Sequence, residues 1–327
     1  METVKDGEVT SMAYDKRQGD FTYRIAGENV VITGYDGRAD ELEIPALIEE
    51  KPITTIGKKA FLSRKSLLKV TLPETIEVME EWAFAYCSSL QSVVLPKKKI
   101  EFGKGVFFHC NSLQEMCVVK TEENVVEQGG NIADVCEADV ENAQKNLHPW
   151  KLLGVVPVLM DAEYLLTPWE AEETHWIEKW DARMLNILNA EDGEGYSKVV
   201  LCGEEDLSAS YEEFVEKKRQ MKAQLAFIRL MNPYCLKEEI EQQLLDYVRT
   251  HTKNCESEAA WEVVKQHGDE KAYFEIFTKT GCLTDENFDG VLEDLGQYHA
   301  EMKAYFMRYK EEKMKKEDFF DSLSLDF

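Results

Sequence analysis

The side chains best suited to metal binding are few and dispersed in this 327-residue sequence. His251 and Cys255 are four residues apart, so a helix would carry both on one face. No second pair of ligands accompanies them, as a structural zinc site would require. Glu172, Glu173 and His175 form another group that is equally incomplete. Neither group predicts a metal centre.

Motifs of catalysis are absent from the sequence as well. It contains no P-loop, no glycine-rich dinucleotide motif, no HExxH motif and no GxSxG motif. The loop at Asp192 begins like a calcium loop, but its twelfth position is Gly203, where such loops need a bidentate glutamate. We therefore predict that the protein is not an enzyme and that it needs no cofactor and no metal.

An enzyme with its site in the C-terminal helical part is the alternative. Trp169, Trp176 and Trp180 stand near helical spacing there and would form its ligand box. Tryptophans at such spacing are more typical of a hydrophobic core, because each ring buries a large apolar area. We interpret the three rings as core residues.

A 23-residue repeat organises residues 53–118. Phe61, Phe84 and Phe107 recur at this step. Three further sets of apolar residues keep the same phase: Leu67, Leu90 and Leu113; Val70, Val93 and Met116; and Leu72, Leu95 and Val118. A fixed period in the twenties with several apolar positions in phase is typical of a leucine-rich solenoid, in which each repeat forms one coil.

Each repeat is predicted to contribute one short strand to a narrow parallel sheet. Since side chains alternate along a strand, Val70 and Leu72 point into the core and their neighbours point outward. Six outward residues are predicted to form the open, partner-binding face of this sheet: Lys69, Thr71, Ser92, Val94, Glu115 and Cys117.

The motifs of these coils resemble the BspA-like (treponemal-type) leucine-rich repeat. The segments ITTIGKKAF, FAYCSSLQSVVLP and FHCNSLQEM carry the resemblance, which extends over about residues 21–118. It implies a short solenoid used for binding, best known from bacterial surface proteins and adhesins. We expect about three coils, the third of them degraded, because Val119 stands where Pro73 and Pro96 end the earlier strands.

Cys87 and Cys110 occupy the same repeat position, where the first coil has Arg64. They would form either a metal or redox pair, or two small buried residues that pack in register between coils. Free cysteine is among the most buried residue types, so we favour packing.

The segments on both sides of the coils are predicted to close the solenoid. Residues 1–20 are polar and form a flexible N-terminus, and residues 21–32 alternate in a pattern that predicts a β-hairpin cap. Residues 119–150 are predicted to be a linker and a capping helix. Val94 and Cys117 are too apolar for a solvated sheet face, so we expect this segment to fold back over them.

Residues 151–327 have a helical pattern and are predicted to form an acidic α-helical domain. The motif KAYFEIF at 271–277 recurs as KAYFMRY at 303–309. Helix pairs at this spacing resemble ankyrin repeats over about residues 205–312, and a bundle of ordinary helical hairpins is the alternative. The predicted fold class is therefore α+β, a solenoid followed by a mainly helical domain.

The net charge of -25 is unevenly distributed. Residues 1–118 carry 15 basic and 18 acidic residues, a net charge of -3, so the remainder carries -22. Such an acidic domain repels nucleic acid and favours a protein partner with basic segments. The segment Asp318–Phe327 alternates acidic and apolar residues. It is either a docking peptide for a partner groove or a tail that frays or packs back on the helical bundle.

We predict a protein–protein interaction module or scaffold with an unknown protein partner; an adhesin-like surface protein, implied by the resemblance, is the alternative. The first residues lack the basic start and apolar stretch of a secretory signal, and no apolar run approaches the ~18 residues of a membrane span. The eight cysteines form no CxxC pair, which suits a reducing compartment. We therefore expect a cytoplasmic protein, with the cell surface as the alternative.

Overall fold

Two compact units make up the chain, and each is described by itself. They comprise residues 1–177, called the solenoid unit here, and residues 178–327, called the helical unit. The computed structural model describes residues 14–119, 148–197 and 210–314.

The solenoid unit begins with three antiparallel strands. They are β1 (Lys16–Gln18), β2 (Phe21–Ala26) and β3 (Asn29–Tyr35). Gly27 has a φ of 64° in the turn between β2 and β3, a conformation that glycine adopts without a steric penalty. β3 then pairs in parallel with the first coil strand, so the hairpin caps the solenoid as predicted.

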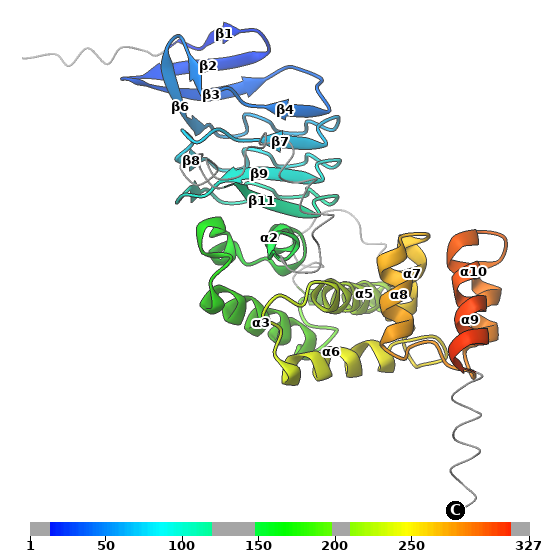
Figure 1. Cartoon of the computed structure of the whole chain (residues 1–327). Coiled ribbons are helices and arrows are strands. Elements are labelled where there is room, and N and C mark those ends of the chain that lie inside the picture. Colours follow the sequence, from blue (N-terminus) through cyan, green and yellow to red (C-terminus); the bar gives the residue numbers. More distant parts are fainter. Residues whose placement is uncertain (1–13, 120–147, 198–209, 315–327) are drawn as a thin grey trace, which may run out of the picture. The chain divides into compact units, whose positions relative to one another are not determined.

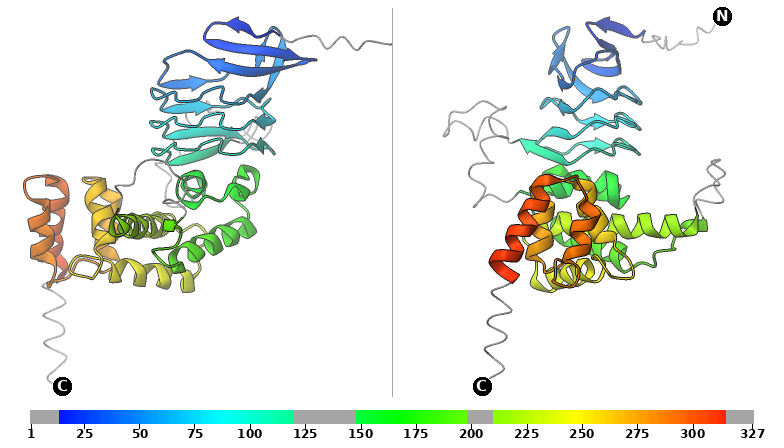
Figure 2. Two further views of the ribbon diagram at one scale, coloured as in Figure 1. Left: turned by 180° about the vertical axis from the view of Figure 1, so that it is seen from behind. Right: turned by 90° about the vertical axis from the view of Figure 1, so that its right-hand side faces the viewer.

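Two parallel sheets form the walls of the solenoid, and Figures 1 and 2 show the coils stacked on one another. The first sheet continues from β3 through β6 (Lys51–Ile56), β8 (Val78–Met79) and β10 (Glu101–Phe102), with β5 (Leu47–Ile48) paired antiparallel to β6. The second sheet contains β4 (Glu41–Glu43), β7 (Lys69–Thr71), β9 (Ser92–Pro96) and β11 (Glu115–Val119). The predicted leucine-rich solenoid is confirmed.

The register of the second sheet follows the repeat. Lys69 pairs with Ser92 and Ser92 pairs with Glu115, so each step along the sheet equals one repeat. Glu41 pairs with Lys69 across a step that is longer than the repeat. An N-terminal turn with irregular spacing therefore precedes the three predicted coils.

The core of the coils contains a column of aromatic rings. Phe61 and Phe84 stack with centroids 4.7 Å apart, and Phe84 and Phe107 with centroids 5.7 Å apart. Tyr35 of β3 extends the column, 5.3 Å from Phe61, and all four side chains are buried. The three phenylalanines fill the space between coils, as their spacing predicts.

A set of short helices follows the last coil within the solenoid unit. They are α2 (Trp150–Val155), the π-helix η2 (Val156–Met160) and two 3₁₀ turns, η3 (Glu163–Leu165) and η4 (Pro168–Glu170). α2 packs on β11 (Figure 1). The backbone N–H of Gly105 donates to Glu163 Oε1 at 2.6 Å, whereas the equivalent N–H of Trp82 donates to a carbonyl of the next coil. A carboxylate thus takes the place of a further coil.

Gly154 permits the close approach of α2 to β11. A Cβ at this position would lie 2.7 Å from Glu115 Cα and 2.8 Å from Glu115 N. We expect Gly154→Ala to destabilise the solenoid unit by about 1–3 kcal/mol, because backbone must move to admit the methyl group. Gly34→Ala is the control, since the nearest atom to its Cβ would be Thr22 Cβ at 3.5 Å. Urea unfolding of both variants checks this, and equal midpoints would contradict it.

Helix α3 (Thr174–Asn189) begins in the last residues of the solenoid unit, and most of it, from Glu178 onward, belongs to the helical unit. It continues with α5 (Tyr211–Met231), α6 (Glu238–Thr250), α7 (Ala259–His267), α8 (Lys271–Lys279), α9 (Phe288–Leu295), α10 (Ala300–Tyr309) and the π-helix η5 (Lys310–Met314). Ser210 caps α5 by accepting from the Glu213 N–H at 3.2 Å. The predicted α+β class, a solenoid and then helices, is confirmed.

The last four α-helices of the described residues form two hairpins. Gly268 and Gly296 follow α7 and α9 with φ values of 58° and 52°, which ends each helix before its partner begins. Trp261, Phe277 and Phe306 pack together across these hairpins. The ankyrin-like interpretation of this region stays a prediction.

Several predictions concern segments outside the described residues. The linker and capping helix predicted over 119–150 fall mainly on 120–147, and the segment Asp318–Phe327 follows the last described residue. The flexible N-terminus includes residues 1–13, which also lie outside. The predicted domain boundaries near 118 and 150 therefore remain a proposal.

Candidate functional site

The structure places the six predicted binding residues in two rows across the second sheet. Lys69, Ser92 and Glu115 are cross-strand neighbours in one row. Thr71, Val94 and Cys117 are neighbours in the other. The rows arise because the coils have the same length, so residues one repeat apart share a register.

The exposure of the six residues differs along the rows. Lys69, Thr71, Ser92 and Glu115 are half-buried, and Ser92 Oγ donates to Glu115 Oε1 at 3.3 Å. Val94 and Cys117 are only 5% and 6% exposed. The accessible part of the face is therefore polar, and the two apolar members do not contribute exposed surface.

β4 adds two residues to the face that the repeat period does not reveal. Glu41 pairs with Lys69 and Glu43 pairs with Thr71, and both glutamates are exposed. The two glutamates are out of phase with the repeat period, because the step from β4 to β7 is longer. The alternating sequence Glu-Leu-Glu nevertheless indicates a strand with both carboxylates on one side. The extended face, defined as Glu41, Glu43, Lys69, Thr71, Ser92 and Glu115, is called the sheet face below.

The edge of the sheet near β11 is held by the segment that precedes α3. Lys97 Nζ lies 2.5 Å from Glu172 Oε2, and η4 lies beside β11. Glu172 thus forms an ion pair within the solenoid unit. The predicted fold-back of residues 119–150 over Val94 and Cys117 stays a prediction, because most of that segment is outside the described residues.

Cys87 and Cys110 pack between coils. Cys87 Sγ donates to the Phe61 carbonyl and Cys110 Sγ to the Phe84 carbonyl, both at 3.1 Å, and both side chains are buried. The thiol interaction with Cys87, together with burial, raises the pKa of Cys110 well above its usual range. Their burial and their hydrogen bonds to backbone carbonyls suit two small residues that pack in register between coils.

The remaining candidate ligands are engaged in local contacts. His251 Nδ1 lies 2.8 Å from the Tyr247 carbonyl, and Cys255 Sγ contacts the Arg249 carbonyl at 3.6 Å. Exposed His175 lies 3.1 Å from Glu173. Within residues 14–119, 148–197 and 210–314, no group of three or more His, Cys, Asp and Glu side chains is arranged to hold a metal ion.

Trp176 and Trp180 are buried and Trp169 is half-buried. Trp176 Nε1 donates to the Leu165 carbonyl at 3.0 Å. These contacts support the interpretation of the rings as core residues.

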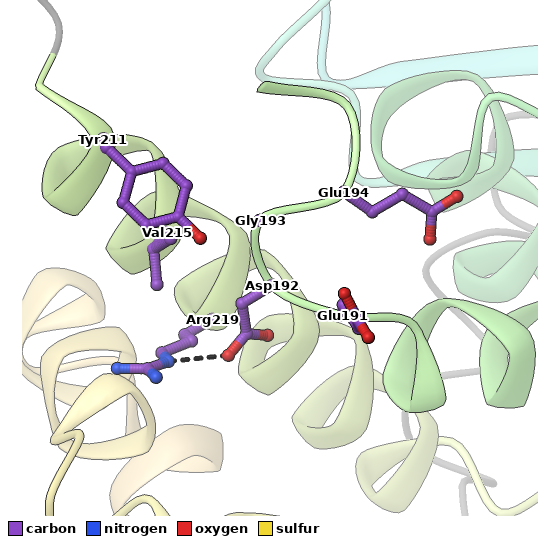
Figure 3. A pocket seen from close by; sticks show the side chains of 7 residues that line it. All are labelled: Glu191, Asp192, Gly193, Glu194, Tyr211, Val215 and Arg219. Carbon is purple, nitrogen blue, oxygen red and sulfur yellow. Dashed lines mark hydrogen bonds and ion pairs between the residues drawn. The ribbon is translucent and has the colours of Figure 1, made fainter. Parts of the chain in front are cut away.

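An open cavity of about 790 Å³ lies beside the loop after α3 (Figure 3). It is formed by Glu191, Asp192, Gly193, Glu194, Tyr211, Val215 and Arg219. Asp192 accepts from Arg219 Nε at 2.8 Å and from buried Lys222 Nζ at 2.6 Å. Its carboxylate therefore balances two cations of α5, which gives the loop a structural role.

Asp192 is expected to make the helical unit sensitive to acid. Burial raises the pKa of its carboxyl group, but hydrogen bonds from Lys222 and Arg219 outweigh burial and lower the pKa below its usual value. The stabilisation is therefore present above the unfolded pKa of about 3.9 and is lost as the pH falls through the lower folded-state value. Urea midpoints at pH 7 and pH 3 should differ less for Asp192→Asn than for the wild type. Exposed Asp289→Asn is the control, and equal acid sensitivity of all three proteins would contradict the expectation.

The coils define the class of the solenoid unit as a leucine-rich repeat protein. Residues 40–131 match the family model described as "BspA type Leucine rich repeat region (6 copies)". This part of the chain is a BspA-type leucine-rich repeat region, as the motifs predict. A comparison with curated proteins found no match.

Solved structures of bacterial leucine-rich repeat proteins are similar over the same third of the chain. The leucine-rich repeat protein of T. pallidum is 24% identical, covers 33% of this chain and 55% of its own, and has a TM-score of 0.30. One from Bacteroides capillosus is 26% identical, covers 33% of this chain and 98% of its own, and has a TM-score of 0.29. The match thus spans about half the length of the first of these proteins.

No helix of the described residues is long and apolar enough to cross a bilayer.

Proposed function

We propose that this protein is a non-catalytic interaction module that binds a protein partner through its sheet face. The in-register rows carry this proposal, since the parallel strands β4, β7, β9 and β11 align polar side chains on one face of the sheet. Repeats of this class generally act as binding modules, and their stacked strands provide an extended surface.

The charges of the sheet face suit a partner with basic and polar groups. The face carries three carboxylates and one ammonium group, and all four side chains are exposed or partly exposed: Glu41, Glu43, Glu115 and Lys69. Complementary charge mainly increases the association rate and the specificity of such a contact. The acidic helical unit provides a second surface of the same sign and acts as a scaffold in this proposal.

A comparison of two triple variants tests the sheet face. The full chain, immobilised as bait, is compared with Lys69→Ala/Ser92→Ala/Glu115→Ala and with Glu77→Ala/Lys99→Ala/Glu101→Ala, which changes exposed residues beside the first sheet. We expect the first variant to lose a partner that the wild type and the second variant retain, as measured by quantitative mass spectrometry. Retention of every partner by the first variant would overturn the proposed face.

A role at the cell surface is the second candidate, because BspA-type repeat proteins are typically surface or interaction proteins. Surface biotinylation of intact cells distinguishes it from the cytoplasmic location that we propose. Labelling of the protein at the level of a known surface protein would support the surface role, and labelling only after lysis would exclude it.

A further inference from the structure

Exposed aromatic side chains cluster on a second surface of the solenoid unit. It is formed by the turns between the two sheets, residues 57–68, 80–91 and 103–114, and is called the turn face here. Trp82, Tyr86 and Phe108 are 40–48% exposed, and His109 is exposed beside them. Aromatic residues are enriched in protein interfaces, where a few of them contribute most of the binding energy.

The rings of the turn face are held in fixed positions before any partner arrives. Tyr86 and His109 stack with centroids 5.0 Å apart, and Phe108 meets both rings edge-on. Lys59 Nζ lies 4.7 Å from the centroid of Trp82. Side chains that are already ordered lose little conformational entropy on binding.

The backbone at three of these residues is unfavourable for an L-amino acid. Trp82, Tyr86 and His109 have φ values of 58°, 60° and 57°, the region that favours glycine. Gly105 occupies the position in the third coil that corresponds to Trp82, with a φ of 61°. Lys59 and Ser63 adopt the same conformation at the equivalent positions of the first coil, with φ values of 60° and 59°. The conformation therefore belongs to the turn of every coil, and the coil does not need a large ring at these positions.

The charge of the turn face is opposite to that of the whole chain. Its three segments contain five basic residues and two acidic ones, whereas the chain has a net charge of -25. The edges of aromatic rings carry the positive end of the ring quadrupole. An acidic segment with aromatic side chains is therefore the complementary ligand.

We propose that the turn face binds residues 318–327 of a second copy of this chain. This segment, Asp-Phe-Phe-Asp-Ser-Leu-Ser-Leu-Asp-Phe, contains three aspartates, three phenylalanines and no basic residue. It lies outside the described residues, so the proposal rests on its sequence and on the surface that it complements. The turn face and the sheet face are separate, and each proposal can fail without the other.

A labelled synthetic peptide with the sequence of residues 318–327 tests the contact by fluorescence anisotropy. The peptide is titrated with two proteins, the full chain and the full chain with Phe319→Ala and Phe320→Ala. In the second protein the substitutions weaken the chain's own segment 318–327 as a competitor of the peptide. We expect saturable binding to both, weakened about tenfold or more when the three aspartates of the peptide are replaced by asparagine, and weakened by added salt. We also expect the wild-type chain to self-associate in sedimentation experiments and the Phe-substituted chain to remain monomeric.

Glycine substitutions remove the rings without endangering the fold. Trp82→Gly/Tyr86→Gly eliminates two side chains and relieves two positive φ angles, so the coil should remain folded. We expect this variant to bind the peptide at least about tenfold more weakly. Tyr298→Ala, which removes a 78% exposed ring of the helical unit, should bind as the wild type does.

Three results would overturn the proposal. The first is no peptide binding to either chain. The second is binding that the glycine substitutions leave unchanged, which would place the peptide elsewhere. The third is binding only to the Phe-substituted chain, which would mean that each chain occupies its own turn face and not that of a second copy.

Discussion

Arg229→Met is expected to destabilise the helical unit by about 3–5 kcal/mol, because it leaves a buried carboxylate without its counterion. Arg229 Nε lies 2.7 Å from Asp181 Oδ1, and both side chains are almost fully buried. The same guanidinium donates to the carbonyls of Asn232 at 2.6 Å and Tyr234 at 3.1 Å, so it also secures the chain after α5. Urea unfolding followed by circular dichroism, which the helices dominate, measures the loss.

A double-mutant cycle separates the ion pair from the other contacts of Arg229. Asp181→Leu/Arg229→Met should be more stable than either single variant, because neither charge is then left unpaired. The double variant should remain less stable than the wild type, because the carbonyls of Asn232 and Tyr234 lose a hydrogen-bond donor. The loss of such a donor costs about 1–3 kcal/mol per buried group.

The exposed pair between Lys237 and Glu178 is a matched control in the same unit. Their nitrogen and oxygen atoms are 2.9 Å apart, but the side chains are more than half exposed. Lys237→Met should therefore change the free energy of unfolding far less than Arg229→Met does, because solvent screens the exposed pair. If both pairs had the same effect, burial would not be the reason for the difference.

Phe84→Ala is expected to destabilise the solenoid unit by about 3–5 kcal/mol. Phe84 is fully buried in the middle of the aromatic column and stacks on Phe61 and Phe107. Its removal opens a cavity between two coils that are fixed by backbone hydrogen bonds on both sides, so the walls cannot collapse to fill it. A short solenoid depends on each interface, because each coil contacts only its neighbours.

Phe108→Ala provides the comparison for this prediction. It removes the same ring from an exposed position next to Phe107 and should change stability by no more than about 1 kcal/mol. Hydrogen exchange measured by mass spectrometry reports on the coils separately from the helices. Equal loss of protection in the two variants would show that the buried column does not stabilise the coils.

The coils were largely predictable from the sequence. Phe61, Phe84 and Phe107 repeat at one period with other apolar residues in phase, and a repeated sequence places equivalent residues in equivalent surroundings. Strand alternation then predicted an outward set on β7, β9 and β11, of which Lys69, Thr71, Ser92 and Glu115 are partly exposed and Val94 and Cys117 are buried. The strand at Glu41–Ile44 was predicted, but its place beside β7 was not, because its step to β7 is longer than the repeat period.

Several helix ends have local sequence signals, whereas the packing of the helices has none. Ser210 and the glycines at 268 and 296 are local signals, and they begin or end helices in the structure. The buried pair of Asp181 and Arg229 has no such signal, since the two residues are 48 positions apart and each is an ordinary helical surface residue by sequence.

The sequence by itself determined the repeat class, the register of the coils and the order of solenoid and helices. These properties depend on local periodicity, which a single chain displays in full. Only the tertiary structure decided which outward residues are accessible, burying Val94 and Cys117 while leaving the ring cluster at Trp82, Tyr86 and Phe108 exposed. Exposure depends on what packs against a residue from distant parts of the chain, and no local pattern contains that information.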